Sequence, residues 1–549
     1  MDSKTLEADY VLVGGGLAGC VLASRLHHAP TRPSVILLEA GPDQHAHPLV
    51  TSPLGAPRLH GSELEWNYQT APQKHLNGRS IYNCGGKLLS GSSAINYGGW
   101  TRGHAADYDL WATIVGDQRW SYKGMLPYFR RTERFHDEHG DAAQHGFDGP
   151  IHTAPVNRSY PLREPVHQAF IEAGLKQNVD ANNGEPLGVA AWTENWRNSV
   201  RQPAGVAYDL SGVKVMTSSP VHRVILSESN RATGAEMIDG RRINARKEVI
   251  ICCGTLRTPQ VLMLSGIGPS ENLAKIGVPQ KVNSPDVGQN FHDHCSLVQF
   301  WKLRNPALGL ANGAPEFFKK DPSFLNGMPF NWVGTDTVQQ ADLHDALLAD
   351  NEVVDAGNIN LHSHLQVPRA HIELIIAYSL LGRPRAEYGL SIDGTHISTG
   401  VLNLLPTSRG TVTLLNSDPN NDPVINPNYF ATHTDHAIMR AGIRRMMQVM
   451  ETPSMRAIVE SETVPSGFSA LTSVSSDEDI DARVRQFSAT WYHFGGSAAM
   501  GKVVDSEFRV MGTEALRVVD ASVIPTPIAA HYQACIYAVA EQAADMILG

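Results

Sequence analysis

The chain has 549 residues, of which 42% are hydrophobic and 18% are charged, and it carries a formal net charge of −10 at pH 7. This length exceeds what a single hydrophobic core supports, so we expect two domains or one elaborated domain. The acidic balance excludes a broad positive surface for nucleic acid or an anionic membrane, which leaves a small molecule as the expected partner.

The N-terminal segment MDSKTLEADY leads directly into an apolar run and contains no apolar signal core. No later stretch approaches the roughly 20 apolar residues that a membrane helix needs. We therefore expect a cytoplasmic protein without a membrane partner. Its expected role is in metabolism, such as the biosynthesis of a specialised compound.

A strand, a helix and a second strand are predicted at the start of the chain. Tyr10–Val13 is a short apolar run typical of a buried strand, and Leu17–His28 has the apolar spacing of a helix packed on it. Ser34–Gly41 supplies the next strand. The turn between the first two elements, GGGLAG at 14–19, follows the GxGxxG pattern of a dinucleotide-binding βαβ unit.

Each glycine of this turn has a separate expected task. Gly14 permits the tight turn, Gly16 lets backbone N–H groups approach a pyrophosphate, and Gly19 lets the helix lie close to the strand. Glu39 follows about 20 residues after the last glycine, where a carboxylate accepts hydrogen bonds from a ribose diol.

The middle of the chain predicts a discontinuous nucleotide domain. Residues 81–111 are rich in glycine and serine, and an aromatic stretch that begins at Asp107–Trp111 indicates helices over a pocket. Lys214–Val224 and Arg242–Cys253 return to apolar strand patterns that are expected to rejoin the first sheet. The six cysteines are scattered, so we expect buried small side chains and no metal site.

A second sheet is expected between about Leu303 and Asp479, with Val401–Leu405 and Thr411–Leu415 among its strands. The chain then ends with a strand in Leu516–Pro525 and an amphipathic helix over Ala534–Leu548.

Several motifs occur in an order that resembles the glucose–methanol–choline (GMC) family of FAD-dependent oxidoreductases. The resemblance rests on Gly14–Gly19 with Glu39, Gly86–Asn96, Arg102-Gly103 with Asp107–Trp111, Gly254–Gly268, VGQNFHDH at 287–294, His493, and DASVIP at 520–525. It spans almost the whole chain. Ser90 stands where the family usually has glycine.

The resemblance implies an α/β fold in which a Rossmann-like FAD-binding domain is interleaved with an α+β substrate domain on an antiparallel sheet. We expect residues 1–155, 205–302 and 485–549 to form the FAD-binding domain. Residues 156–204 and 303–484 are expected to form the substrate-binding domain.

The same resemblance implies the cofactor and the residues that hold it. The expected FAD-binding residues are Gly14, Gly16, Gly19, Glu39, Gly91, Asn96, Val221, Asp520, Ala521, Tyr532 and Gln533. Val221 would contribute its backbone. Relatives that attach their flavin covalently use a histidine just before the loop asparagine, whereas this chain has Ile95 there, so we expect non-covalent FAD.

His493 corresponds to the family's catalytic histidine, and His531 takes the place of its partner, which is an asparagine or a histidine in relatives. An alcohol must lose its hydroxyl proton as hydride leaves its carbon, and a neutral imidazole suits that task near pH 7. Two imidazolium groups repel each other, so one histidine should stay neutral. Tyr532 departs from the proline common in relatives. The HDH motif at 292–294 lacks metal-ligand spacing and is expected to be structural.

These features predict an FAD-dependent alcohol oxidase or dehydrogenase that acts on a small uncharged alcohol, aromatic and specialised-metabolite alcohols included. Its electron acceptor is oxygen or another acceptor. Three alternatives stay open: a non-redox lyase on the same flavin scaffold, similar to the family's hydroxynitrile lyases, a nicotinamide-dependent dehydrogenase, and a non-catalytic binding protein.

Overall fold

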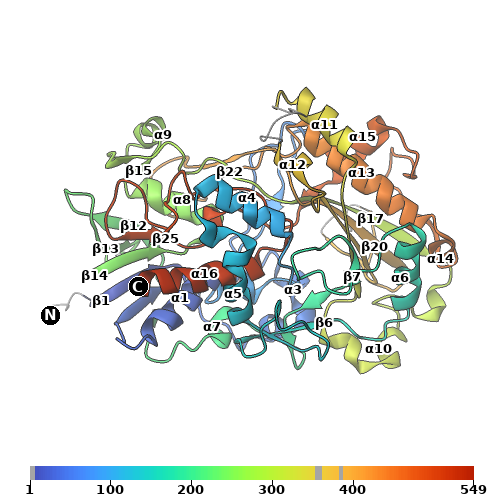
Figure 1. The fold of residues 1–549 in the computed structure, drawn as a ribbon, viewed down its shortest axis with the longest axis horizontal. Coiled ribbons are helices and arrows are strands. Elements are labelled where there is room, and N and C mark those ends of the chain that lie inside the picture. Colours follow the sequence, from blue (N-terminus) through green and yellow to red (C-terminus); the bar gives the residue numbers. More distant parts are fainter. Residues whose placement is uncertain (1–5, 353–361, 383–387) are drawn as a thin grey trace.

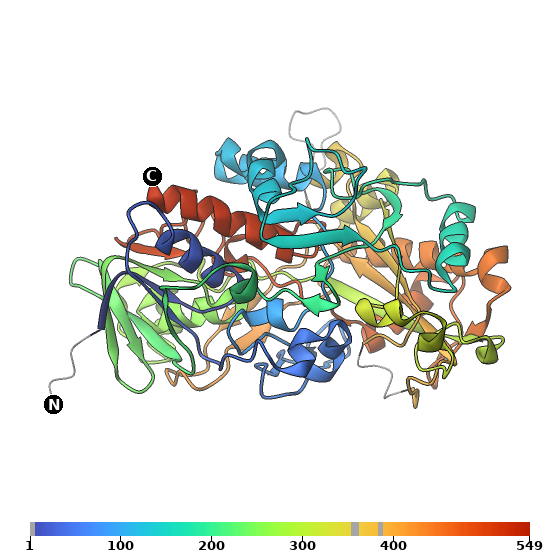
Figure 2. The same ribbon diagram turned by 90° about the horizontal axis from the view of Figure 1, so that it is seen from below.

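The computed structural model describes residues 6–352, 362–382 and 388–549, and two large sheets dominate this part of the chain. The first sheet lies beside helices α1 and α16, and the second lies at the opposite end of the molecule (Figures 1 and 2). The N-terminal segment, for which the sequence predicts no signal peptide, begins with residues 1–5, which lie outside the described residues. No described helix is both long and apolar enough to cross a membrane.

The first sheet has a parallel centre with an antiparallel extension. Strands β2, β1 and β14 run parallel, whereas β14, β13 and β12 pair antiparallel. The sheet consists of β1 (Leu6–Val13), β2 (Val35–Leu38), β11 (Lys214–Met216), β12 (Val221–Leu226), β13 (Ala232–Met237), β14 (Arg242–Ile251) and β25 (Leu516–Val518). The segments expected to rejoin this sheet do so, although the run Lys214–Val224 is broken, and its two halves lie at opposite edges.

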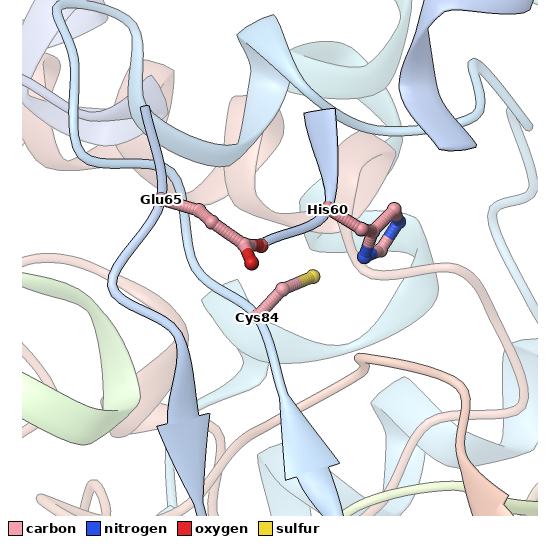
Figure 3. Close-up of side chains that lie close together, drawn as sticks. All are labelled: His60, Glu65 and Cys84. Atoms are coloured by element: carbon pink, nitrogen blue, oxygen red, sulfur yellow. The ribbon is translucent and has the colours of Figure 1, made fainter. Parts of the chain in front are cut away.

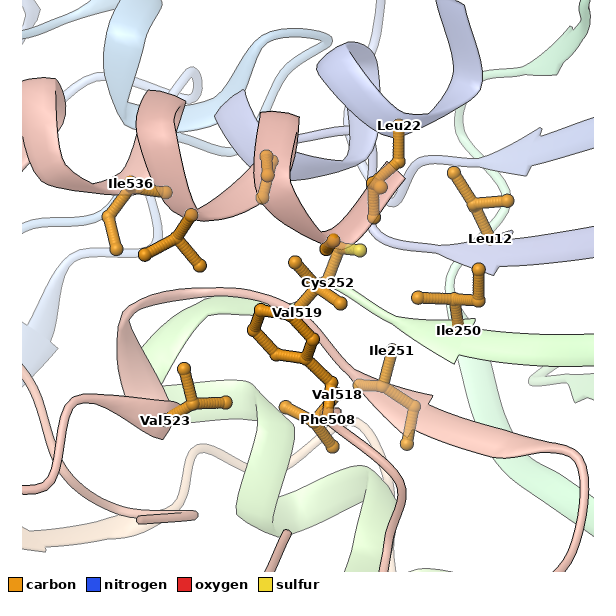
Figure 4. Packing of buried hydrophobic residues seen from close by; sticks show 14 of the residues in the cluster. Leu12, Leu22, Ile250, Ile251, Cys252, Phe508, Val518, Val519, Val523 and Ile536 are labelled. Carbon is orange, nitrogen blue, oxygen red and sulfur yellow. The ribbon is translucent and has the colours of Figure 1, made fainter. Parts of the chain in front are cut away.

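Helices α1 (Leu17–His27), α5 (Tyr122–Thr132) and α16 (Gln533–Leu548) pack on one another beside this sheet (Figure 1). Their apolar side chains meet those of the strands in one core. Figure 4 shows Leu22 of α1, Leu12 of β1 and Ile250 of β14 close together in it. The core holds the glycine turn between β1 and α1 in place, because both flanking elements are buried.

The second sheet is antiparallel throughout. Its strands are β7 (Gly188–Ala191), β17 (Cys295–Leu303), β18 (Trp332–Asp336), β19 (Ile372–Ala377), β20 (His396–Asn403), β23 (Val459–Glu462) and β24 (Ala489–Thr490). Helix α13 (His433–Met450) covers one face. Successive side chains of a strand point to opposite faces, so Leu297 joins the core on the α13 side while Ser296 and Val298 face a cavity.

Two expectations about segments are wrong. Residues 411–415 do not join the second sheet, because β21 (Thr411–Thr413) pairs with β22 (Val424–Asn426) alone and packs near α8 (Gly254–Leu264). The aromatic stretch forms helices as expected, α4 (Ala105–Val115) and α5, but Trp111 and Phe129 are buried in the first core and do not line the cavity.

The expected FAD-binding segment ends at residue 302, yet β17, which spans Cys295–Leu303, lies inside the second sheet. The domain boundaries themselves stay a prediction. The fold class expected from the sequence, a mixed sheet with an antiparallel second sheet, is confirmed.

Candidate active site

A cavity of about 830 Å³ is lined by residues of both sheets. Nearly all the site residues predicted from the sequence lie on its wall, although they come from segments far apart in the chain. They are Gly14, Gly16, Glu39, Gly91, Asn96, Val221, His493, Asp520, Ala521, His531, Tyr532 and Gln533.

One part of the cavity is formed by the turn between β1 and α1. Gly14 has φ +105°, and a Cβ there would lie 2.5 Å from the carbonyl oxygen of Cys252, so only glycine fits. Gly16 precedes α1 without a side-chain cap, and the first turn of the helix has no acidic residue. Its backbone N–H groups therefore suit an anion such as a pyrophosphate.

Gly19 is the one predicted cofactor residue that does not line the cavity. A Cβ at Gly19 would lie 2.0 Å from the carbonyl oxygen of Gly14. Its place in α1 therefore agrees with the packing task expected for it.

Glu39 follows β2, as predicted, and its side chain is buried at the edge of the cavity. Its carboxylate accepts hydrogen bonds from the backbone N–H groups of Gly15 at 2.9 Å and Gly41 at 2.7 Å. Burial raises the pKa of Glu39 to about 7, against the opposing effect of these hydrogen bonds. The two N–H groups fix the carboxylate where a ribose is expected.

These features fit a bound FAD. The uncapped helix start suits the pyrophosphate, and Glu39 suits the ribose. A Cβ at Gly16 would meet no protein atom closer than 3.8 Å, so the glycine leaves open space on the cavity side. The cavity wall also includes Gly91, Asn96 and Tyr532.

Hydrogen bonds hold the side chain of Asn96 from two sides. Asn96 donates from Nδ2 to Gln533 Oε1 at 3.0 Å, and Arg201 Nη1 donates to Asn96 Oδ1 at 3.1 Å. Gly91 has φ +52° and lies against Gly16, because a Cβ there would be 2.8 Å from the Gly16 Cα. The serine-rich loop and the glycine turn are therefore in direct contact.

Asp520 connects two segments of the cavity wall through hydrogen bonds. Its carboxylate accepts hydrogen bonds from Gly254 N at 2.9 Å, Thr258 Oγ1 at 2.6 Å and Ser522 N at 2.8 Å. It thereby joins the start of α8 to the turn that carries Ala521. Burial raises the pKa of Asp520.

The imidazoles of His493 and His531 face each other on the cavity wall, with ring centroids 4.5 Å apart. His493 follows β24, and Tyr492 before it has φ +66°, so the chain turns sharply at this point. His531 lies two residues before the start of α16, and its backbone N–H donates to Thr101 Oγ1 at 2.6 Å. Two distant segments thus bring the two predicted catalytic histidines together.

The HDH motif at 292–294 lies directly behind His493. Asp293 accepts a hydrogen bond from the backbone N–H of His493 at 2.9 Å, and His294 Nδ1 lies 3.0 Å from His493 Nδ1. Asp293 also accepts from Thr490 and Tyr429. The motif therefore orients His493 through its Nδ1 side and leaves Nε2 for the cavity.

The second histidine has a carboxylate partner. His531 Nε2 lies 2.9 Å from Glu373 Oε1, and both side chains are largely buried. Glu373 extends from β19 on the face shared with Ile375, which lines the cavity. The carboxylate therefore fixes the orientation of the His531 ring.

The two histidines thus have different electrostatic surroundings. Burial, and then electrostatic repulsion between the neighbouring His531 and His294 rings and a protonated His493, lowers the pKa of His493 well below its ordinary value of 6.5. Burial likewise lowers the pKa of His294 to about 3. His493 is consequently a neutral imidazole near pH 7, which leaves it able to accept a proton.

Sequence reasoning missed two of these contacts. Glu373 lies about 160 residues from His531, inside an apolar strand where nothing marks it as special. His294 is expected from the sequence to be structural, and its contact with the ring of His493 is a further detail that the sequence does not reveal. For Glu373, the one available signal is a carboxylate inside an otherwise apolar strand.

The arrangement combines a helix start suited to phosphate with a neutral histidine placed to accept a proton. Together they define an oxidoreductase that uses a dinucleotide cofactor.

Comparison with known proteins identifies the family. Models described as GMC oxidoreductase match residues 8–296 and 406–540. The chain is 47% identical to the GMC-type oxidoreductase acuG of Aspergillus aculeatus, over 100% of this chain and 99% of that protein. It is 32% identical to an alcohol dehydrogenase [acceptor] of Pseudomonas putida, over 98% of this chain and 95% of that protein. Formate oxidase of Aspergillus oryzae, solved as a single-substitution variant, has a similar structure, with a TM-score of 0.86 and 28% sequence identity. The match covers 99% of this chain and 98% of the formate oxidase chain.

The chain therefore belongs to the GMC oxidoreductase family, and the resemblance noted in the sequence is confirmed. It is a GMC-family FAD-dependent oxidoreductase, whose relatives act on CH–OH donors. FAD is the cofactor typical of this family, and an alcohol dehydrogenase [acceptor] is among the relatives.

Proposed function

We propose that this protein oxidises the CH–OH group of a small uncharged alcohol to an aldehyde or ketone, with His493 as the base. The observation that carries the proposal is the pair of imidazoles facing each other on the wall of the cofactor cavity. When bound, FAD supplies the acceptor for the hydride. Gly14, Gly16 and Glu39 would hold its nucleotide half, with Gly91, Asn96, Val221, Asp520, Ala521, Tyr532 and Gln533 along the remainder.

The protein's part in the reaction is to remove one proton and to stabilise the oxygen that loses it. His493 Nε2 accepts the hydroxyl proton, because burial keeps this imidazole neutral. His531 Nε2 pairs with Glu373, which leaves Nδ1 for a hydrogen bond with the substrate oxygen. The carboxylate of Glu373 thereby orients the His531 ring toward the substrate.

An anaerobic alcohol panel tests this function. The purified yellow protein should bleach with at least one alcohol of the panel, and the reoxidation step should then be followed by peroxide and by dye reduction side by side. Peroxide would indicate oxygen as the acceptor, and dye reduction alone would indicate another acceptor. A flavin that no alcohol bleaches would instead favour the non-redox lyase on the same scaffold.

Acid precipitation should separate FAD from the protein. Ile95, which is buried at the cavity wall, occupies the position where covalently flavinylated relatives carry a histidine. We expect a colourless pellet and a yellow supernatant. A yellow pellet after denaturation would contradict non-covalent attachment.

The rate of flavin reduction should stay flat between about pH 6 and pH 8. The lowered pKa of His493 keeps the base unprotonated until the pH falls far below 6.5. Stopped-flow reduction at saturating alcohol measures this rate directly. A rate that fell on acidification with a midpoint near 6.5 would argue against a neutral, buried His493.

Glu373→Gln should slow flavin reduction by about 10-fold, because the ring of His531 loses the carboxylate that orients it. Stopped-flow reduction of the variant and of the wild type at saturating alcohol compares the two rates. The flavin spectrum and circular dichroism show whether the variant folds and holds FAD. A folded variant that reduces FAD at the wild-type rate would show that this contact does not position His531.

A further inference from the structure

Three side chains with metal-binding atoms meet at the cavity, apart from the histidine pair. His60 follows α3 (Ala56–Leu59), Cys84 follows β4 (Tyr82–Asn83), and Glu65 lies between them in sequence. Figure 3 shows the imidazole, the carboxylate and the thiol directed toward one another. Their ligand atoms all lie within 4.8 Å of one another, and Glu65 and Cys84 are buried.

The chemical types of these three groups match a thiophilic divalent cation. Thiolate, imidazole and carboxylate are the ligands found around zinc, and three protein ligands with an open fourth position are typical of zinc sites that bind a further ligand. Zinc–ligand bonds of about 2.0 to 2.3 Å place tetrahedral ligand atoms roughly 3.3 to 3.8 Å apart. The three ligand atoms, which lie within 4.8 Å of one another, therefore reach these distances through side-chain movements of about 1 Å.

The neighbouring hydroxyls suit such a site. His60 Nε2 lies 3.1 Å from the Tyr97 hydroxyl, and a metal-bound histidine commonly uses its second nitrogen in this way. His60 Nδ1 lies 3.2 Å from the Tyr82 hydroxyl, which also donates a hydrogen bond to Glu65 Oε1, so an ion bound between these groups would displace that hydroxyl. Glu65 Oε1 accepts a hydrogen bond from Gly61 N at 2.5 Å. A carboxylate has enough lone pairs to accept this hydrogen bond and to bind a metal ion as well.

Access to the group is open from the cavity. His60, Tyr82, Cys84 and Tyr97 all line it, so an ion can enter without unfolding of the chain. The ring of His60 also lies 5.4 Å from that of Tyr492, the residue before His493. The group is therefore close to the reaction centre but separate from the two histidines.

We propose that His60, Glu65 and Cys84 bind a thiophilic divalent cation, with Zn²⁺ as the best match, in the cavity wall. The spacing of residues 60, 65 and 84 follows no metal motif, so the sequence does not predict this site. Binding releases the thiol proton, so affinity for the ion should fall as the pH is lowered.

Titration of the FAD-loaded protein with Co²⁺ tests the proposal directly. One equivalent per chain should produce d–d absorption bands at longer wavelengths than the oxidised flavin absorbs, and Zn²⁺ should abolish them. Wild-type protein that gains no such bands at one equivalent overturns the site. This measurement depends on neither enzyme activity nor any variant.

Substitutions then assign the ligands. Cys84→Ser and Glu65→Gln should each weaken Zn²⁺ binding by about 100-fold or more, and Tyr97→Phe by about 10-fold. Cys253→Ser is the matched control, since Cys253 is a second thiol on the cavity wall outside the metal-binding group. Circular dichroism and the flavin spectrum show whether each variant folds. Folded Cys84→Ser protein that keeps the cobalt bands would overturn the assignment.

Discussion

Replacing His493 by alanine should slow the reduction of bound FAD by alcohol by about 10²- to 10⁴-fold, the range that a positioned general base contributes. The loss is expected because the hydroxyl proton then has no acceptor within the buried site. FAD content should stay at the wild-type level, since the predicted contacts with the nucleotide half lie at Gly14, Gly16 and Glu39. Anaerobic stopped-flow absorbance measures the reduction rate, and the flavin spectrum measures occupancy.

His371→Asn is the matched control for this experiment. His371 is also a buried imidazole whose pKa is lowered by burial, but it pairs with Thr337 and His364 and does not line the cavity. This control should reduce FAD at the wild-type rate. Added imidazole should restore part of the rate in His493→Ala, because the removed ring leaves space on the cavity wall. If His493→Ala turned over nearly normally, another group would have to be the base.

The parts of the fold that were predictable depend on local patterns. The βαβ unit places a strand, a glycine turn and a helix within 30 residues, so apolar spacing and the glycines identify it. Residues 411–415 have an equally strand-like pattern. They pair with Val424–Asn426 instead of the large sheet, because partner choice depends on contacts that a short apolar run does not encode.

The residues of the candidate site likewise fall into those that the sequence predicts and those that it does not. His493 and His531 could be predicted because the motifs around them resemble those of the GMC family. The structure places the centroids of their rings 4.5 Å apart. Glu373 could not, because its contact with His531 arises only when β19 exposes one face to the cavity. The cluster of His60, Glu65 and Cys84 likewise depends on three turns meeting in space.

Two glycines of the first turn should respond oppositely to alanine. Gly16 has φ −74° and ψ −166°, which alanine tolerates, and its Cβ would meet no protein atom closer than 3.8 Å. Gly16→Ala should therefore leave the melting temperature of the FAD-free protein unchanged and weaken FAD binding by about 10- to 100-fold, as the methyl group overlaps the cofactor's position. Gly19→Ala should instead destabilise the FAD-free protein by about 1 to 3 kcal/mol, because its Cβ would lie 2.0 Å from the Gly14 carbonyl oxygen.

Thermal melts of the FAD-free proteins and FAD titrations followed by flavin fluorescence separate the two effects. Gly78→Ala serves as the reference for a glycine substitution away from the turn, since nothing lies within 4 Å of its Cβ position. Although its φ of +70° introduces backbone strain, its FAD affinity should match that of the wild type. Wild-type FAD affinity in Gly16→Ala would mean that the cofactor does not approach this turn, and the roles of Gly14, Gly16 and Glu39 would then have to be reassigned together.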